Sequence, residues 1–408
     1  MILNPFSTLV MFLFISCQSY GLKKTIHQTS MQTNPPLSQT KVIVGAQRIS
    51  EYLPILQNKK VALVVNHTSL VNGVHLLDTL LAQKIKVTKV FAPEHGFRGD
   101  MSAGAIIKDQ KDQKTGVPLI SLYGKKKKPK PEDLANVEVV LFDIQDVGVR
   151  FFTYISTLHY VMEACAENGK QLILLDRPNP NAHYVDGPVL NMKYSSFVGM
   201  HPIPIVYGMT IGELAQMIQG EKWIGASNKL QMKIVNCLHY THSDRVVLQD
   251  KPSPNLPNEK SILLYPSICL FEGTSVSLGR GTTAPFQIYG HPDFPVLDTS
   301  YTPIDRPGAI DPPHESLLCH AVSLQGISNE EIRSTGAIQL SYLLDSYKKL
   351  GKSNDFFLKN LFFDKLAGTE ELRLQVKAGV KESDIRKSWQ PKLKEFKQIR
   401  KKYLIYKD

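Results

Sequence analysis

The sequence predicts an α/β protein in which a doubly wound parallel sheet is followed by a smaller C-terminal α/β domain. Short apolar runs alternate with helix-like segments for about 150 residues after Lys41, as in parallel sheets with helical crossovers. Clusters of polar residues follow the ends of several of these runs. From about Pro295 the alternation stops, which indicates a second structural region.

The composition is that of a globular protein. The 408 residues are 42% hydrophobic and 21% charged, and this length suits two domains or one large one. The formal net charge is +11, but much of the excess lies in two runs, Lys125–Lys128 and 392–403. No zinc finger or aromatic RNA-binding signature accompanies these runs, so we interpret them as solvated surfaces and expect no nucleic-acid partner. A basic enzyme that acts on an acidic substrate fits the charge.

Several common site motifs are absent. The five cysteines include no CxxC pair, so a metal site built on cysteine is not expected, and no HExxH set occurs. No GxGxxG follows a predicted strand, and the glycines of SLGRGT do not have P-loop spacing. A GxSxG nucleophile motif is also missing. These absences leave carboxylate chemistry as the main candidate.

The N-terminal segment predicts export. Residues 1–17 contain the apolar run Leu9–Ile15, which is too short to span a membrane but fits the apolar region of an export signal. Ser16 and Cys17 resemble a loose lipobox, so Cys17 is a candidate lipidation site. The alternative is an unstructured apolar N-terminus on a cytoplasmic protein. Residues 18–40 are polar and predict a flexible tether, so we expect a periplasmic protein or a lipoprotein anchored in the cell envelope.

The elements of the first domain follow in order from Lys41. KVALVV at 60–65 is typical of a buried parallel strand, and similar runs recur along the chain. We predict strands at 60–65, 86–91, 117–122, 137–143 and 171–176, with helices at 48–57, 76–84, 131–134 and 152–168. Right-handed crossovers would bring the carboxyl ends of these strands to one edge of the sheet.

The second half of the chain is less regular. A helix capped at Thr210 and extending to Gln219 is predicted, followed by a strand at 230–238. Residues 251–290 appear as a long, loop-rich segment whose interspersed aromatic residues argue against disorder. We then expect a strand at 338–343, a helix through Lys348 and a basic helix at 383–402, in which Trp389 is a packing anchor. These patterns predict a sheet domain at 41–260 and a smaller domain at 261–408.

Polar clusters at the predicted strand ends mark a candidate ligand crevice. A single Asp or Asn after a strand can be a helix cap or a turn residue. Here four clusters share one predicted edge, where open α/β sheets bind ligands. They are Asn66, His67 and Thr68; Glu94, His95 and Arg98; Asp143, Gln145, Asp146 and Arg150; and Asp176, Arg177, Asn179 and Asn181.

The residue types in these clusters favour acid–base chemistry on a sugar. Glu94 lies between Phe91 and Phe97, and burial there would keep it protonated as a general acid. Asp143 or Asp146 is the candidate second carboxylate of a glycoside hydrolase. Arginines can bind an anionic substrate group, and Arg98, Arg150 and Arg280 are candidates, although Arg150 can equally pair with Asp143 or Asp146. Tyr154 can stack on a sugar ring.

Six blocks of this sequence resemble a known family. FAPEHGFRGD, DIQDVGVRFFTYISTLHYVMEAC, LDRPNPN, DGPVL, FVGMHPIPIVYGMTIGELA and FEGTSVSLGRGTTAPF occur in that order. They are similar to the NamZ-type exo-β-N-acetylmuramidases, formerly a domain of unknown function. One departure is the Lys251-Pro252 pair that opens KPSPNLPN, where relatives often carry Trp-Pro, and this difference would alter a wall of the cleft.

The resemblance implies a Rossmann-like domain and a smaller α/β domain with the active site in the cleft between them. It implies release of N-acetylmuramic acid from the non-reducing ends of peptidoglycan fragments in cell-wall turnover or recycling, with no cofactor and no metal. Glu94 matches the proposed catalytic acid. The residues that we expect to contact substrate are Asn66, His95, Arg98, Arg150, Tyr154, Asp176, Arg177, Glu272 and Arg280.

Two other functions remain open from the sequence. One is a non-catalytic envelope protein that binds peptidoglycan fragments without cutting them. The other is a different hydrolase that uses His95 or His67 as its base. An acidic side chain with apolar neighbours, as at Glu94, is not required for binding alone and favours the glycosidase.

Overall fold

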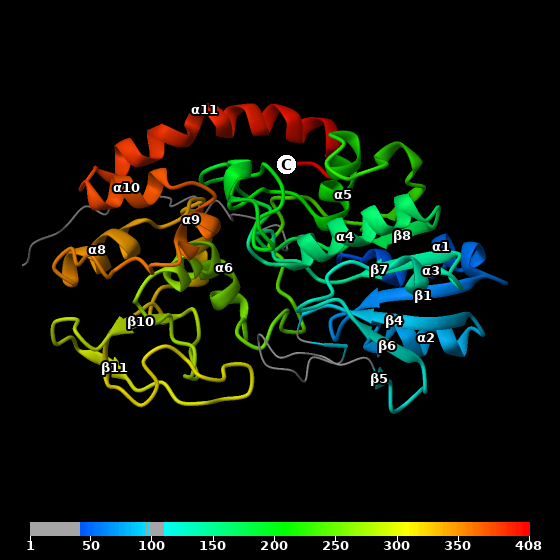
Figure 1. The fold of residues 1–408 in the computed structure, drawn as a ribbon, viewed down its shortest axis with the longest axis horizontal. Coiled ribbons are helices and arrows are strands. Elements are labelled where there is room, and N and C mark those ends of the chain that lie inside the picture. Colours follow the sequence, from blue (N-terminus) through cyan, green and yellow to red (C-terminus); the bar gives the residue numbers. More distant parts are fainter. Residues whose placement is uncertain (1–40, 95, 98–109) are drawn as a thin grey trace, which may run out of the picture. The chain divides into compact units, whose positions relative to one another are not determined.

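A seven-stranded sheet forms the first half of the fold (Figure 1). The computed structural model describes residues 41–94, 96–97 and 110–408, and Lys41–Asp408 is one compact unit. The predictions made for the export signal, Cys17, the tether, His95 and Arg98 lie outside the described residues. Within the described part, no helix is long and apolar enough to cross a membrane.

The sheet order is β5-β6-β4-β1-β7-β8-β9. Its strands are β1 (Lys60–Val65), β4 (Lys86–Ala92), β5 (Gln110–Lys111), β6 (Pro118–Ser121), β7 (Val139–Asp143), β8 (Gln171–Leu175) and β9 (Met232–Val235). All neighbours are parallel except β5, which pairs antiparallel with β6 at one edge. Taken in chain order, the six parallel strands have the 3-2-1-4-5-6 arrangement of the Rossmann fold, so the predicted doubly wound sheet is confirmed.

Helices cover both faces of the sheet because successive side chains of each strand point to opposite faces. On β1, Val61 and Leu63 share one core with residues of α1 (Ile49–Leu56) and of α2 (Leu76–Ala82), and Leu77 of α2 belongs to this core. Ala62 and Val64 belong to the other core, with α4 (Tyr154–Glu167) and α5 (Ile211–Gly220). The short α3 (Pro131–Leu134) precedes β7, and the small hairpin β2 (Leu70–Val71) and β3 (Val74–His75) follows β1.

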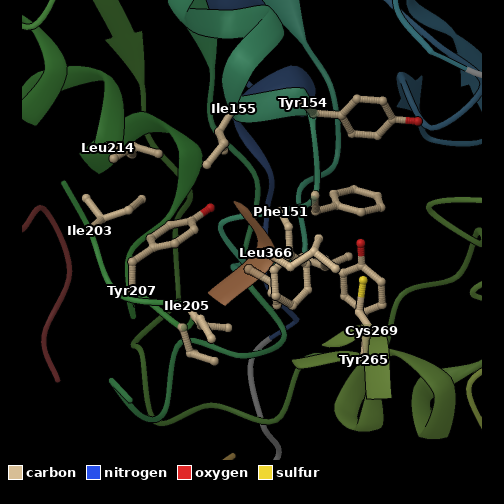
Figure 2. Packing of buried hydrophobic residues seen from close by; sticks show 14 of the residues in the cluster. Phe151, Tyr154, Ile155, Ile203, Ile205, Tyr207, Leu214, Tyr265, Cys269 and Leu366 are labelled. Carbon is tan, nitrogen blue, oxygen red and sulfur yellow. The ribbon is translucent and has the colours of Figure 1, made fainter. Parts of the chain in front are cut away.

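The start of α5 confirms the predicted cap. Thr210 accepts a hydrogen bond from the Glu213 N–H, and the Glu213 side chain accepts one from the Thr210 N–H. This reciprocal pair satisfies two backbone donors that a helix start leaves free. The cap fixes α5 beside α4, and the two helices share one core with Ile203, Ile205 and Tyr207 (Figure 2).

The C-terminal part contains a three-stranded antiparallel sheet with helices around it, which confirms the predicted smaller α/β domain. The strand order is β10-β12-β11. The elements are α6 (Glu259–Ile268), η4 (Cys269–Gly273), β10 (Ile288–His291), β11 (Thr299–Tyr301), β12 (Cys319–Ser323), α7 (Asn329–Ser334), α8 (Ser341–Lys349), α9 (Phe362–Ala367), α10 (Glu371–Lys377) and α11 (Glu382–Arg400). The predicted basic helix is α11, and its Trp389 is buried as expected.

Two predictions of secondary structure in this part are wrong. The loop-rich segment 251–290 contains α6, whose residues from Ser261 to Ile268 are all buried. A helix that is buried on every side has no amphipathic period, and α6 also contains Pro266, a residue that is unfavourable inside a helix. The predicted strand at 338–343 is also wrong, because α8 begins at Ser341 and buries Leu343 and Tyr347 four residues apart. A short apolar run does not distinguish a strand from a buried helix start.

The end of the chain returns to the first sheet. Figure 1 shows α11 running from the side of α10 to the side of α5, where η5 (Lys401–Tyr403) follows. The Tyr406 hydroxyl then donates to the Asp176 carboxylate at 2.6 Å, at the carboxyl end of β8. The backbone N–H groups of Ile405 and Tyr406 donate to Glu213 Oε1 at 2.8 and 3.0 Å.

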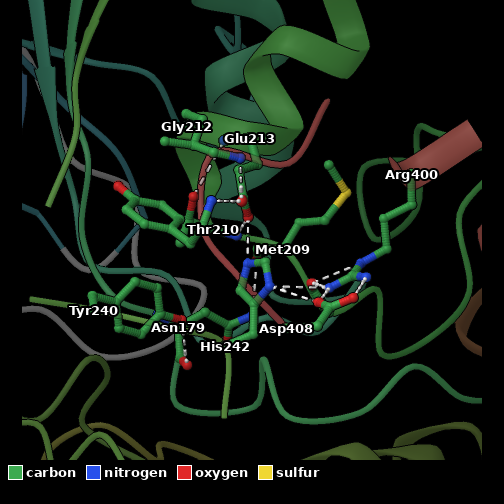
Figure 3. A network of polar contacts seen from close by, with 12 residues as sticks. Asn179, Met209, Thr210, Gly212, Glu213, Tyr240, His242, Arg400 and Asp408 are labelled. Carbon is green, nitrogen blue, oxygen red and sulfur yellow. Dashed lines mark hydrogen bonds and ion pairs between the residues drawn. The ribbon is translucent and has the colours of Figure 1, made fainter. Parts of the chain in front are cut away.

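A polar network holds this chain end in place (Figure 3). His242 Nε2 lies 2.8 Å from Glu213 Oε2, and its Nδ1 lies 2.8 Å from Asp408 Oδ1. Arg400 donates to Asp408 and to the Gly208 carbonyl. The hydrogen bonds from Arg400 lower the pKa of Asp408 to about 2. The last residues of the chain therefore stabilise α5 and β8 through hydrogen bonds to Glu213 and Asp176. These contacts join the C-terminal part to the first domain in addition to the chain segment that links them.

Candidate active site

A cavity of about 270 Å³ lies where the carboxyl edge of the large sheet meets the C-terminal part. We call it the Glu94 cavity. It is lined by Glu94, Tyr123, Phe151, Phe152, Thr153, Tyr154, Phe197, Val198, Ser253, Asn255, Leu256, Tyr265, Cys269, Glu272, Arg280, Phe286, Phe362 and Leu366. Strand-end loops and the start of α4 supply one wall, and α6, η4 and α9 supply residues of the other. Its size suits one sugar residue rather than a polysaccharide chain.

Glu94 is half-buried at the end of β4 and is held by two hydroxyl groups. Thr153 Oγ1 donates to Glu94 Oε2 at 2.8 Å. Thr153 is the N-cap residue of α4, yet its side chain makes no capping bond. Its hydroxyl donates to the Glu94 carboxylate instead. Tyr123 also hydrogen-bonds with Glu94, and burial together with the Glu94 charge raises the pKa of its phenol. Tyr123 therefore stays protonated and keeps Glu94 oriented.

Glu272 and Arg280 form an ion pair in the same cavity. Arg280 Nη2 lies 2.5 Å from Glu272 Oε1, and both side chains are about a quarter exposed. Burial alone would lower the pKa of Arg280, but the Glu272 carboxylate outweighs it, so the pKa of Arg280 is raised. The guanidinium also lies over the Phe286 ring, 5.4 Å from its centroid. Arg280 is thus a fixed cation at the cavity wall.

Aromatic rings form much of the remaining wall. Phe151 and Tyr265 meet edge to face with centroids 5.3 Å apart, and Phe152 meets Tyr154 in the same way at 4.8 Å. Figure 2 shows Phe151 and Tyr154 on one side, with Tyr265, Cys269 and Leu366 of the C-terminal part nearby. Such a wall presents flat apolar faces to a sugar ring and excludes water from the carboxylates.

Asp143 and Arg177, predicted as catalytic and substrate-binding residues, form a buried ion pair outside this cavity. Arg177 Nε lies 2.5 Å from Asp143 Oδ1, and Arg177 Nη2 lies 2.8 Å from Oδ2. Burial alone would lower the pKa of Arg177, but Asp143 raises it. Arg177 lines a separate cavity of about 850 Å³, with Thr68 and Gln145 at the same sheet edge. The residues predicted to share one crevice therefore lie at two separate cavities, and Arg177 lines the one that does not contain Glu94.

Asp146 and Asp176 are also buried and do not line the Glu94 cavity. Asp146 Oδ2 accepts hydrogen bonds from the Tyr207 hydroxyl and the Gly148 N–H. Asp176 accepts from Thr210 Oγ1, the Gly212 N–H and Tyr406. Burial raises the pKa of each carboxyl to about 6. Their contacts connect segments of the first domain and, through Tyr406, join the C-terminal end of the chain to β8, which is a structural role.

Arg150 and Asn66 are fully buried as well. The Arg150 guanidinium donates to the carbonyls of Pro188, Ile203 and Leu366 at 2.7–2.9 Å. Among the described residues, Arg150 does not pair with Asp143 or Asp146 as expected, and it does not line the Glu94 cavity. Arg150 instead joins the first domain to α9. Asn66 Oδ1 accepts from the Thr68 N–H and hydroxyl and shapes the loop after β1.

Models of one protein family match most of the chain. The N-terminal region of the family described as "Exo-beta-N-acetylmuramidase NamZ" matches residues 61–260, and the C-terminal region matches residues 263–406. The chain belongs to the NamZ exo-β-N-acetylmuramidase family. The predicted family resemblance is thereby confirmed, and with it the assignment of the chain as a glycosidase.

Individual relatives agree with this placement. The chain is 39% identical to the peptidoglycan β-N-acetylmuramidase NamZ of Bacillus subtilis (strain 168), over 91% of this chain and 93% of that protein. A DUF1343 family crystal structure from Bacteroides fragilis has a TM-score of 0.84 and 47% identity over 90% of this chain and all of that one. A second DUF1343 family structure from the same organism has a TM-score of 0.73 and 29% identity, over 90% of this chain and 99% of that one.

Both matched regions of the NamZ family contribute to the Glu94 cavity, since Glu94 and Asn255 lie in the first and Glu272 and Arg280 in the second. Of the residues predicted from sequence, the structure brings Glu94, Tyr154, Glu272 and Arg280 together here. Tyr123, Thr153 and Asn255 were missed. Tyr123 follows the end of β6, so the strand-end rule that found Glu94 also identifies it. Asn255 lies in a proline-rich loop whose path the sequence does not indicate.

Proposed function

We propose that this chain releases N-acetylmuramic acid from the non-reducing ends of peptidoglycan fragments, with Glu94 as the proton donor. The observation that carries the proposal is a carboxylate at the sheet edge, held by Tyr123 and Thr153 inside a cavity with room for one sugar. An exo-acting enzyme needs a closed site for the terminal sugar only. Family membership and the named relative support the same reaction and a place in cell-wall turnover or recycling.

The chemistry assigned to Glu94 is general acid catalysis. Its proton passes to the glycosidic oxygen as the bond from that oxygen to C1 breaks, and the departing sugar leaves as a neutral alcohol. Glu94 is then a carboxylate and can take a proton from the water that completes hydrolysis. Tyr123 and Thr153 donate to that carboxylate and hold it in place through both steps.

Among the residues that the structure describes, no second free carboxylate lines the Glu94 cavity. Among the described residues that line it, the other acidic side chain is Glu272, which is paired with Arg280. We assign the nucleophile to the 2-acetamido oxygen of the substrate, which attacks C1 while Glu94 protonates the leaving oxygen. Water then opens the cyclic intermediate, so the product forms with retention of configuration.

Arg280 is assigned to the lactyl carboxylate that distinguishes N-acetylmuramic acid. A guanidinium binds a carboxylate through two parallel hydrogen bonds, and a fixed cation selects the anionic sugar over its neutral neighbour. Glu272 occupies one edge of Arg280 and leaves the rest of the guanidinium for the substrate. The aromatic wall receives the sugar ring.

Export and lipid anchoring belong to the same proposal. The apolar run Leu9–Ile15 and the Ser16-Cys17 pair support an export signal with Cys17 as the lipidated residue. Residues 18–40 would then tether the enzyme in the envelope, where its substrate is. Labelling with palmitate and fractionation test this, because a Cys17→Ala protein should lose the label and leave the membrane fraction.

The activity is tested with a disaccharide of N-acetylmuramic acid β-linked to N-acetylglucosamine. Mass spectrometry should show both monosaccharides, and NMR of the fresh product should show the β anomer first. Appearance of the α anomer first would overturn the acetamido mechanism. A protein that binds the disaccharide but leaves it intact would be a non-catalytic binding protein, and the proposed function would be wrong.

A further inference from the structure

A loop of the C-terminal part, residues 303–318, exposes an unusual number of aliphatic side chains. We call it the rim loop. Ile304, Ile310, Leu317 and Leu318 are 47%, 65%, 52% and 56% exposed. They are four of the eleven large apolar side chains that are exposed in the described part of the chain, so exposure is concentrated in this segment. Exposed apolar side chains that are concentrated in one segment favour a binding surface there.

The rim loop has a stiff backbone. It contains four prolines, at positions 303, 307, 312 and 313. Pro307 and Gly308 form a tight turn in which the Ala309 N–H donates to the Arg306 carbonyl at 2.9 Å, and Gly308 has a positive φ of 91°. The Ser316 N–H closes the loop on the Pro303 carbonyl at 2.9 Å. A stiff loop loses little entropy when a ligand binds to it.

The rim loop is attached directly to two walls of the Glu94 cavity. Asn255, which lines the cavity, donates from Nδ2 to the Gly308 carbonyl at 2.7 Å. The Ile304 N–H donates to the carbonyl of Gly281, the residue after Arg280, at 3.1 Å. Gly281 approaches so closely that a Cβ there would lie 2.7 Å from the Ile304 carbonyl oxygen. The loop therefore borders the cavity at Asn255 and Arg280.

The charge of the rim loop differs from that of the cavity wall beside it. Asp305, Asp311 and Glu315 are carboxylates, and Arg306 is the one Lys or Arg in the loop. Two of these carboxylates are held in place, since the Asp311 N–H donates to Asp305 Oδ1 at 2.7 Å and the Asp305 N–H donates to Glu315 Oε1 at 3.2 Å. A cation at Arg280 thus lies next to an acidic, aliphatic surface.

We propose that the rim loop is the surface that receives the departing sugar, and that it selects a neutral N-acetylhexosamine there. This inference rests on the proposed function. The Glu94 cavity has room for the terminal sugar alone, so the next sugar must lie at its border. Ile304 and Ile310 contact its ring face and acetyl methyl group, while the loop carboxylates repel a second lactyl carboxylate. Arg280 and the rim loop together therefore fix which of two alternating sugars enters the cavity.

The test compares two substrates that differ only in the departing group. The disaccharide reaches the rim loop, whereas methyl β-N-acetylmuramide does not. For an Ile304→Ser/Ile310→Ser protein, we expect kcat/KM for the disaccharide to fall about five- to twentyfold, mainly through KM, as apolar contacts are lost. The value for the methyl glycoside should stay within about twofold.

Leu374→Ser is the matched control, because Leu374 on α10 is 50% exposed and does not belong to the rim loop. It should leave kcat/KM for both substrates unchanged. An equal effect of the rim-loop substitutions on both substrates, or no effect on either, would overturn the assignment. If the unmodified protein cleaves neither substrate, the proposed function itself has failed, and this result is distinguishable from the other two.

Discussion

Breaking the Asp143–Arg177 pair tests whether these residues are structural or catalytic. Arg177→Met leaves a carboxylate without its ion-pair partner at a position that is 0% exposed, and Asp143→Leu leaves the guanidinium without its bidentate partner. Removal of one member of a buried pair costs about 3–5 kcal/mol. We therefore expect each single substitution to lower the free energy of unfolding by that amount.

The double substitution measures the interaction between the two side chains apart from their contacts with the rest of the protein. Asp143→Leu/Arg177→Met leaves no unpaired charge and loses mainly the Arg177 hydrogen bond to the Leu70 carbonyl. Its cost should be about 1–2 kcal/mol. The coupling energy from the double-mutant cycle is then at least about 4 kcal/mol. Urea unfolding followed by circular dichroism gives all four free energies.

The same variants also test whether Asp143 or Arg177 takes part in catalysis. The double variant should retain kcat within about fivefold, because neither side chain lines the Glu94 cavity. A coupling energy below about 1 kcal/mol would refute the buried ion pair as described. A loss of kcat of about 10³-fold or more in a stably folded double variant would restore Asp143 to the reaction.

Three further predictions concern other residues. Burial raises the pKa of Asp146 to about 6 from its ordinary 3.8, so the stability that its protonation contributes is present below pH 3.8 and lost as the pH rises through 6. Between pH 4 and pH 7.5, the free energy of unfolding of Asp146→Asn should therefore rise by up to about 3 kcal/mol relative to that of the unmodified protein, and an equal difference at both pH values would contradict this. Tyr123→Phe should lower kcat about three- to tenfold without a change in the urea midpoint, since it removes one hydrogen bond to Glu94, and an unchanged kcat would show that Tyr123 does not orient it. Tyr406→Phe should cost about 1–3 kcal/mol in urea unfolding because the buried Asp176 carboxylate and the Cys237 N–H lose a partner, and a neutral result would show that the chain end does not support β8.

The sequence predicted the sheet well because its signals are local. KVALVV, VFA and QLILL are buried on both faces and appear as continuous apolar runs, so β1, β4 and β8 lie within a residue or two of their predicted positions. The helix α6 was missed because its burial on every side removed the amphipathic period. A helix that is buried on every side loses the period by which a sequence pattern identifies it, whereas a strand that is buried on both faces remains recognisable as a short apolar run.

The site was predicted only in part for a different reason. Strand ends located Glu94 correctly, but they could not show that Arg177 turns back onto Asp143 or that Arg150 reaches carbonyls as far along the chain as Leu366. Such pairings depend on side-chain direction across the fold and leave no trace in spacing. Arg280 and Glu272 were predicted to contact substrate although they lie far along the chain from the strand ends, and the fold brings them to the cavity in η4 and in the segment after it.

The central claim is that Glu94 protonates the departing sugar, and Glu94→Gln tests it most directly. The disaccharide needs that proton, whereas a 2,4-dinitrophenyl β-N-acetylmuramide has a leaving group that departs without it. We expect kcat/KM for the disaccharide to fall about 10²–10⁴-fold and that for the dinitrophenyl substrate to fall far less, with an unchanged unfolding curve. Retention of disaccharide cleavage within about tenfold, or an equal loss on both substrates, would contradict the account.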